Sequence, residues 1–478
     1  MSYLNKSLID IIEALKNKQV SAKELVEESL LLANKYSKYN PFVTILGDTK
    51  VNSEAPLYGV PYALKDNFST KDILTTGSSN ILKDYIPVFD ATVVEKLKES
   101  GATLIGKTVL DELAMGGTGV SGHTGRVYNP YDPSLNTISG GSSAGSAVAV
   151  ALGIVPFAIG SDTGDSVRKP AAHCGIVGIK PTYGRISRYG LFPFATSIDH
   201  VAYFTRTVRD SAFLLSLLEG SDNKDATAST REGHNYLKDL NTDVKGKKIA
   251  VISEIVDCIS EPSILSSLDN AISIYKEGGA TVERVSVDLN LLRAILPVYM
   301  IISCSEATSN NAGLDGINFT SREEGNDFEE VMINSRSKGL GKSVKNRLVL
   351  GAYCLDNENI ENVFIKAQKV RSLITETINN IFKDYDAILL PASADAAPTF
   401  DTLSDRMSDE CIIGENHLAI ANLGGFPSLT LPYGFKGNLP LGVNLTCKAF
   451  DEQTLFNLSA YLESKLPYEN MIAKEEEK

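Results

Sequence analysis

Residues 134–186 constrain the fold most strongly, because serine, glycine and alanine are frequent in this stretch and its first charged side chain is Asp162. Small side chains let backbone segments approach closely, and glycine allows unusual backbone angles. Within the stretch, residues 147–159 form the longest nearly apolar run of the chain, interrupted by Gly153 and Pro156. The run is far shorter than the roughly 20 residues of a membrane span, so we expect it in a buried core.

Helical and strand-like patterns alternate along the rest of the chain. Helices are predicted at 7–17, 21–36, 91–100, 262–277 and 451–465, and strands at 57–65, 102–106, 248–253, 386–391, 428–433 and 441–446. Gly101 and Gly279 each separate a helical stretch from an apolar run, which is the position of a helix C-cap leading into a strand. The alternation predicts an α/β fold.

The 478 residues would allow about three domains, but no repeat or low-complexity linker divides the sequence. We therefore predict one domain over 1–478. Its parts are N-terminal helices at 1–50, a core at 51–215, a mostly helical middle section at 216–385, a return to the core sheet at 386–466, and a disordered tail at 467–478.

Composition excludes several classes of protein. The 59 acidic and 46 basic side chains give a net charge of −13, which disfavours direct binding to nucleic acid. The six cysteines form no C-x-x-C pair and the five histidines have no metal-ligand spacing, so we predict no metal site. Scattered thiols and the absence of an apolar signal core predict a cytoplasmic protein that is not bound to a membrane.

Two short motifs suggest other chemistries. Residues 101–108, GATLIGKT, match the phosphate-binding pattern G-x-x-x-x-G-K-[ST]. That loop follows a strand, whereas a charged helix is predicted before Gly101, so we favour a helix cap. Residues 141–145, GSSAG, match the G-x-S-x-G elbow of α/β-hydrolases. No strand is predicted before it, and no later histidine has a distinctive context.

Serine and lysine side chains offer a third chemistry, which needs no histidine. Amide cleavage requires a nucleophile, a base and donors for the oxyanion. Lys65 lies in the apolar run GVPYALKDN, where burial would favour the neutral amine and make it a base. Ser142 and Ser166 lie in two loops of small residues, SGGSSAGSA and GSDTGDS. A solvated strand end for Lys65 and two plain turns for the serines are the alternatives.

Together these three segments resemble the amidase signature family. The resemblance runs from about residue 4 to 465 and includes LDELAMGG at 110–117 and YGRISRYGLFPFATSID at 183–199. It implies an α/β fold in which a large, mixed, twisted β-sheet is covered by helices on both faces.

The resemblance also implies catalytic roles. By motif match, Lys65 resembles the general base, Ser142 the bridging serine after a cis peptide bond, and Ser166 the acyl-forming nucleophile. The implied oxyanion hole consists of the backbone N–H groups of Thr163, Gly164, Asp165 and Ser166.

Within the family, the chain most resembles the glutaminase subunits of tRNA-dependent amidotransferases. This implies that it hydrolyses glutamine and supplies ammonia for converting Glu-tRNA(Gln), or also Asp-tRNA(Asn), to the amide. Arg347 matches the arginine that binds the glutamine carboxylate, Tyr299 a pocket tyrosine, and Glu415 the acid that binds the substrate amino group. The implied partners are the B and C subunits of a heterotrimer, with aminoacyl-tRNA reached through the complex. No cofactor is expected on this chain, and ATP and Mg²⁺ are expected at the B subunit.

The sequence departs from the family pattern beside the nucleophile. The family usually has glycine where Asp165 stands, and a carboxylate there opposes an oxyanion unless Arg168 or Lys169 pairs it. Asp165 motivates one alternative, a catalytically weakened scaffold. A stand-alone amidase for small amides is a second alternative, against which Arg347 and Glu415 argue.

Overall fold

A single mixed sheet organises the computed structural model, which describes residues 2–47, 50–402, 408–468 and 470–473. The strand order within this part of the chain is β1-β3-β2-β4-β6-β5-β10-β11-β9-β7-β8. The strands are β1 (Phe42–Ile45), β2 (Pro61–Lys65), β3 (Thr103–Thr108), β4 (Phe157–Asp162), β5 (Val177–Lys180), β6 (His200–Thr205), β7 (Lys248–Ile252), β8 (Thr281–Val285), β9 (Ala387–Pro391), β10 (Ser428–Lys436) and β11 (Leu439–Cys447).

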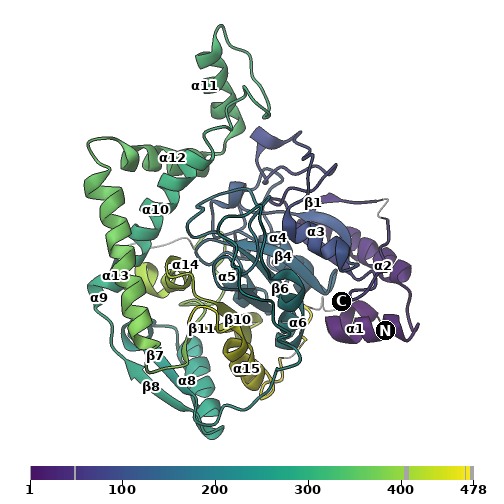
Figure 1. Cartoon of the computed structure of the whole chain (residues 1–478), viewed down its shortest axis with the longest axis vertical. Helices are drawn as coiled ribbons and strands as arrows, with labels where there is room; N and C mark the ends of the chain where they lie inside the picture. The colour runs from purple at the N-terminus through teal and green to yellow at the C-terminus, as the bar shows by residue number, and fades with distance from the viewer. Residues whose placement is uncertain (1, 48–49, 403–407, 469, 474–478) are drawn as a thin grey trace.

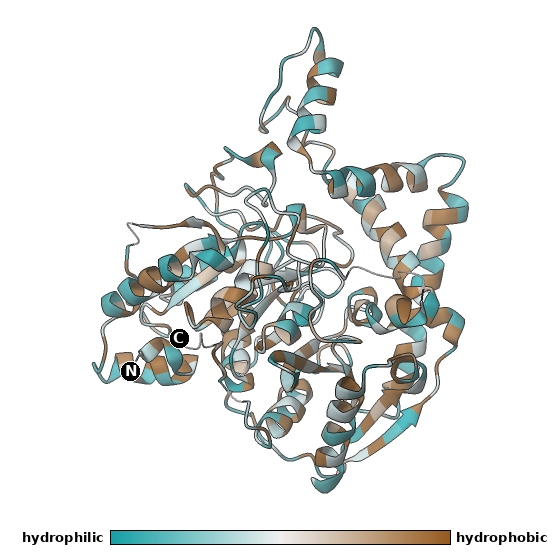
Figure 2. Cartoon of the chain, turned by 180° about the vertical axis from the view of Figure 1, so that it is seen from behind, coloured by the Kyte–Doolittle hydropathy of each residue, from teal (hydrophilic) through white to brown (hydrophobic). Residues whose placement is uncertain are grey.

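Helices surround this sheet (Figure 1). They are α1 (Leu8–Lys16), α2 (Ala22–Lys35), α3 (Thr92–Glu99), α4 (Ala144–Ala151), α5 (Arg168–His173), α6 (Val208–Leu218), α7 (Ser253–Asp257), α8 (Pro262–Glu277), α9 (Leu289–Arg293), α10 (Ile295–Asn310), α11 (Phe328–Gly339), α12 (Lys342–Leu355), α13 (Lys366–Ile381), α14 (Ile420–Leu423) and α15 (Glu452–Glu463). Hydrophilic and hydrophobic residues alternate along the outer helices, as expected for helices with one face on a core (Figure 2).

Parallel pairing places two strand ends side by side in the first half of the sheet. β2 pairs in parallel with β3 on one side and with β4 on the other. The carboxyl ends of β2 and β4 therefore lie at the same sheet edge, where ligand sites form in open α/β sheets. Lys65 ends β2, and the loop that carries Ser166 follows β4.

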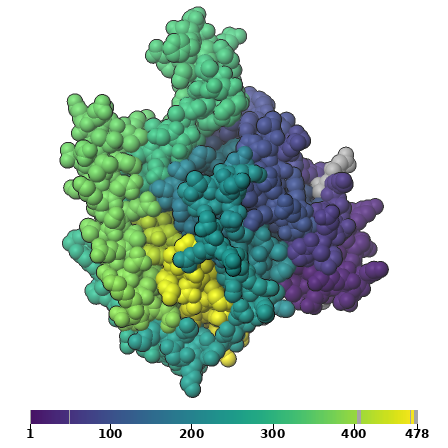
Figure 3. All heavy atoms as spheres, viewed as in Figure 1, coloured from purple at the N-terminus to yellow at the C-terminus, as the bar shows by residue number. Residues whose placement is uncertain are grey.

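Antiparallel pairing of β5 with β10 joins the two halves of the sheet. The first half comes from residues before 206 and the second from residues after 247. The space-filling view shows the C-terminal segment, in yellow, between later middle-section residues in green and an earlier segment in teal (Figure 3).

The small-residue stretch folds into α4 and β4, which pack against each other without exposed residues. A Cβ atom added to Gly145 would lie 2.2 Å from the Pro41 carbonyl oxygen, so only glycine allows this approach. The prediction of a buried core at 147–159 is confirmed, because all of these residues are buried. The run divides into the end of a helix and the start of a strand.

Several element bounds differ from the predicted ones. The strand predicted at 57–65 begins only at Pro61, because residues 55–59 form a turn with Tyr58 and Gly59 at positive φ. The middle section includes a polar stretch near residues 318–346, which contains α11 and projects away from the body (Figure 1). Of the segment 467–478, predicted to be disordered, the described residues 470–473 pack on the body through an Ala473 N–H bond to Ala151 O, and 474–478 lie outside the described residues.

One helical stretch of the described residues, 289–310, is long and apolar enough to cross a membrane by length and composition alone. It consists of α9 and α10, and α10 packs against α12 and α13. A core helix of a globular protein meets the same criterion.

Candidate active site

Lys65 is fully buried at the end of β2. Its Nζ atom lies 2.8 Å from Ser142 Oγ, 2.8 Å from Ser161 Oγ and 3.2 Å from the Ser161 carbonyl oxygen. Burial lowers the pKa of Lys65 from 10.5 to about 7, against an opposing effect of three nearby carboxylates, which belong to Asp111, Asp162 and Asp199. The neutral amine is therefore accessible near neutral pH.

The three contacts of Nζ suit both protonation states of the amine. An ammonium group has three N–H donors, one for each oxygen. The neutral amine has two N–H bonds and one lone pair. A hydroxyl can donate a hydrogen bond to this lone pair, whereas a carbonyl oxygen cannot. Ser142 is thus placed to give its proton to Lys65, while the Ser161 carbonyl oxygen accepts one N–H bond.

Ser142 lies just before α4 and follows a cis peptide bond at Gly141. Asp111 fixes this segment from the other side. Its carboxylate accepts five hydrogen bonds of 2.8 to 3.1 Å from the loop 118–121, and its own N–H donates to the Ser142 carbonyl oxygen. A Cβ atom on Gly141 would lie 2.1 Å from this carboxylate, so the position requires glycine.

Ser166 lies in the loop between β4 and α5, next to the Ser142 segment. The Ser143 N–H donates to the Ser166 carbonyl oxygen over 3.1 Å. Within the described residues, no hydrogen bond joins the Ser142 and Ser166 hydroxyls, and the N–H groups of Gly164, Asp165 and Ser166 donate to no acceptor. Catalytic hydrogen bonds often close only when substrate binds, and free N–H donors suit an oxyanion.

A buried ion pair of Arg168 with Asp162 holds the Ser166 loop in place. Arg168 forms two hydrogen bonds to the Asp162 carboxylate, at 3.0 and 3.1 Å, and also donates to the Gly164 carbonyl oxygen and to Asn422. Burial alone would raise the pKa of Asp162, but Arg168 holds it below its ordinary value. The loop is thus fixed to β4 and to α14, and a longer contact of 3.4 Å from Arg168 to Ser428 Oγ reaches β10 in the second half of the sheet.

Asp165 pairs with Lys169, one of the two cations considered from the sequence. Lys169 Nζ lies 3.1 Å from Asp165 Oδ2 and 3.0 Å from Glu415 Oε2. Glu415 therefore lies next to the Ser166 loop, and Lys169 connects its carboxylate to that of Asp165. The pairing offsets the negative charge that Asp165 places beside the predicted oxyanion hole.

Tyr299 lies against the Ser166 loop, and Arg347 is near enough to Tyr299 to affect it electrostatically. Tyr299, from α10, covers Gly164 so closely that a Cβ atom there would lie 3.0 Å from the ring. Burial raises the pKa of the Tyr299 phenol, and the nearby Arg347 guanidinium opposes this rise. Arg347 stacks 5.8 Å from the centre of the Phe194 ring, and its buried Nη1 has no hydrogen-bond partner among the described residues.

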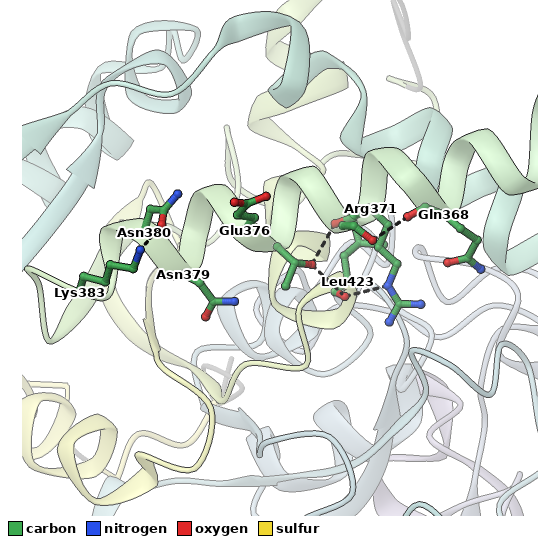
Figure 4. Close-up of a pocket in the computed structure, with 9 residues that line it drawn as sticks. Gln368, Arg371, Glu376, Asn379, Asn380, Lys383 and Leu423 are labelled. Atoms are coloured by element: carbon green, nitrogen blue, oxygen red, sulfur yellow. Dashed lines mark hydrogen bonds between the residues drawn. The ribbon is translucent and has the colours of Figure 1, made fainter.

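A groove of 630 Å³ along α13 lies outside this constellation (Figure 4). Arg371 is its main cation, but its guanidinium donates to the Leu423 carbonyl oxygen and to Ser197. Thr375 donates to the Arg371 carbonyl oxygen within the helix. The Arg371 guanidinium therefore has its hydrogen-bond partners within the protein itself.

Sequence reasoning missed two polar residues of the site. Ser161 contacts the Lys65 amine and also accepts a hydrogen bond from Asn67 at 3.0 Å. The sequence did indicate Ser161, because it is the first serine of the GSDTGDS segment. Asp111 lies in the LDELAMGG segment, and the small residues that follow it indicate a loop that an acceptor can organise.

Comparison with known proteins identifies the family of the chain. The sequence pattern of the family described as Amidase matches residues 5–456. The A subunit of glutamyl-tRNA(Gln) amidotransferase from Sulfurihydrogenibium sp. is 39% identical, with 98% of this chain and 99% of that protein covered. Its counterpart from Carboxydothermus hydrogenoformans is 41% identical, covering 96% and 97%.

A solved structure extends the likeness to the fold. The crystal structure of the A subunit of glutamyl-tRNA(Gln) amidotransferase from Thermotoga maritima superimposes with a TM-score of 0.84 at 34% identity, covering 99% of this chain and 98% of that one. The α/β fold with its large mixed sheet is thereby confirmed. From the matched pattern and the full-length relatives, the chain belongs to the amidase family.

Proposed function

We propose that this chain is the glutaminase subunit of a tRNA-dependent amidotransferase and releases ammonia from glutamine. The observation that carries the proposal is the buried Lys65 amine, 2.8 Å from Ser142 and beside the Ser166 loop. Relatives named as the A subunit of glutamyl-tRNA(Gln) amidotransferase match nearly the whole chain, which supports this particular amide over others.

In the proposed reaction, neutral Lys65 takes the Ser142 proton while Ser142 takes that of Ser166. Ser166 Oγ then bonds to the amide carbon of glutamine. The N–H groups of residues 163–166 stabilise the tetrahedral oxyanion. The proton held by Lys65 then passes through Ser142 to the amide nitrogen, the C–N bond breaks and ammonia leaves. A glutamyl ester remains on Ser166, and water hydrolyses it to glutamate.

The proposed complex acts in the cytoplasm and includes the B and C subunits. The B subunit would bind ATP and Mg²⁺ and activate the tRNA-bound carboxylate, and the C subunit would join this chain to it. An acidic chain suits this division of labour, because the net charge of −13 disfavours tRNA binding by the glutaminase itself.

Co-expression with the candidate B and C subunits from the same source tests the proposal. We expect a stable complex that releases ammonia from glutamine and converts Glu-tRNA(Gln) to Gln-tRNA(Gln). A chain that purifies alone, hydrolyses small amides and ignores the tRNA would be a stand-alone amidase. A complex that forms but releases no ammonia would make the chain a scaffold.

The pH dependence should report the Lys65 base. The pKa of Lys65 is about 7, so the neutral form gains population as the pH rises through this value. We expect kcat/KM for glutamine to increase about tenfold per pH unit below pH 7 and to level off above it. Initial rates of ammonia release between pH 5.5 and 9 check this, and a profile that is flat below 7 would exclude Lys65 as the base.

Arg347 should control the affinity for glutamine. Replacing Arg347 by glutamine removes the proposed partner of the substrate carboxylate, so we expect KM to rise about tenfold to hundredfold, with a smaller change in kcat. Lys342→Gln is the control, because Lys342 is an exposed cation of the same helix, α12. Equal effects of the two substitutions would indicate a general charge effect.

A further inference from the structure

An ion triad of Asp165, Lys169 and Glu415 stands beside the proposed nucleophile. The single ammonium of Lys169 lies between the two carboxylates, at 3.1 Å from Asp165 Oδ2 and 3.0 Å from Glu415 Oε2. Two carboxylates and one ammonium carry a net charge of −1. The triad therefore retains one negative charge that its own members do not neutralise.

The two carboxylates differ in how their oxygens are used. Glu415 Oε1 accepts the Ala394 N–H at 2.8 Å and Oε2 pairs with Lys169, so both oxygens have partners. Asp165 uses Oδ2 for Lys169, and within the described residues no hydrogen bond reaches its Oδ1. Of these four carboxylate oxygens, Asp165 Oδ1 is thus the one without a hydrogen bond in the described part of the chain.

The two carboxylates also border different cavities. Asp165 borders a cavity of 20 Å³, whose other lining residues are Gly164, Leu296, Tyr299, Asn416 and Ala419. This volume holds one group of the size of a water molecule, and an ammonium group has that size. Glu415 faces a different cavity of 920 Å³, together with Lys169.

We propose that Asp165, and not Glu415, binds the α-ammonium group of the glutamine substrate; this rests on the proposed glutaminase function. Tyr299 lines the small cavity and also lies near Arg347, the proposed partner of the substrate carboxylate. The ammonium and carboxylate of an amino acid are attached to the same carbon, so neighbouring partners suit them. Asp165 is then a specificity-determining residue that distinguishes amino acids from simple amides.

Steady-state ammonia release by the complete complex tests this role with two amides. Glutaramate has the terminal amide and carboxylate of glutamine but lacks the amino group. Asp165→Gly leaves Lys169 and Glu415 as a neutral pair, and Asp165→Asn is its isosteric counterpart. For both variants we expect the ratio of KM for glutamine to KM for glutaramate to rise about tenfold or more, because only glutamine carries the amino group.

A second substitution gives a rescue that a structural role would not produce. Adding Lys169→Gln to Asp165→Gly frees Glu415 and restores the net charge of −1. We expect KM for glutamine to return to within about threefold of the original value. Unchanged KM for glutamine in the single variants, or equal losses on both amides, would overturn the inference and leave the glutaminase function intact. Failure of the unaltered complex to hydrolyse either amide would overturn the proposed function, and the ammonium site with it.

Discussion

Replacing Ser166 by alanine is expected to abolish glutamine hydrolysis, with a loss of at least about 10⁴-fold in kcat. The substitution removes the oxygen that forms the proposed acyl bond and leaves the backbone N–H donors in place. Folding should persist, because no hydrogen bond of the described residues involves the Ser166 hydroxyl, whereas the backbone contact from Ser143 remains. Ammonia release and thermal unfolding, measured on the same preparation, check both expectations.

Ser459→Ala is the matched control for this experiment. Ser459 is also a buried serine, it lies in α15, and its hydroxyl has no partner among the described residues. We expect this variant to keep full activity. In the unaltered protein, acid-quenched samples should carry a glutamyl adduct on Ser166 by mass spectrometry. Turnover by Ser166→Ala, or an adduct on another residue, would show that the nucleophile is misassigned.

Replacing Lys65 by methionine should reduce kcat/KM by about 10³-fold or more, because positioned proton transfer contributes roughly 10² to 10⁴ and triad members act as a unit. Stability should stay equal or rise, since methionine fills the buried space without desolvating an amine. Lys65→Arg should be inactive as well, because a guanidinium does not lose its proton in proteins. An active arginine variant would contradict a base at this position.

Lys107 provides the comparison that separates chemistry from folding. It is also fully buried, and its ammonium lies 3.4 Å from Asp66. Burial lowers the pKa of Lys107 to about 8, and the Asp66 charge opposes this shift. Lys107→Met would leave the Asp66 carboxylate without its cation, so we expect a loss of about 3–5 kcal/mol in stability. Chemical denaturation should therefore show Lys65→Met to be the more stable variant, although it is the less active of the two.

The fold and the principal site residues could be predicted because they depend on local pattern. Lys65 ends an apolar run, and Ser142 and Ser166 lie in distinctive loops of small residues. The paired strand ends of β2 and β4 then bring these segments together. Their family assignment is confirmed by the relatives, whereas their catalytic roles stay predictions.

Other features depend on contacts that a single sequence does not specify. Ser161 reaches Lys65 only because β4 lies beside β2, and the pairing of Asp165 with Lys169 depends on the first turn of α5. The predicted role of Glu415 did not include Lys169, which lies 246 residues away in sequence. The bounds of α11 were not predicted within the mostly helical middle section, because its polar sequence lacks an apolar face large enough to distinguish it from a loop.

The support of the Ser166 loop also sets an order for biosynthesis. Arg168 bonds to the carbonyl oxygen of Leu418, 250 residues later in the chain, and to Asn422 beyond it. At about 5–20 residues per second a ribosome adds these residues roughly 12 to 50 seconds after Arg168. The nascent chain thus carries Lys65, Ser142 and Ser166 well before their surroundings are complete. The Ser166 loop consequently gains these two supports only after residues 418–422 have been synthesised.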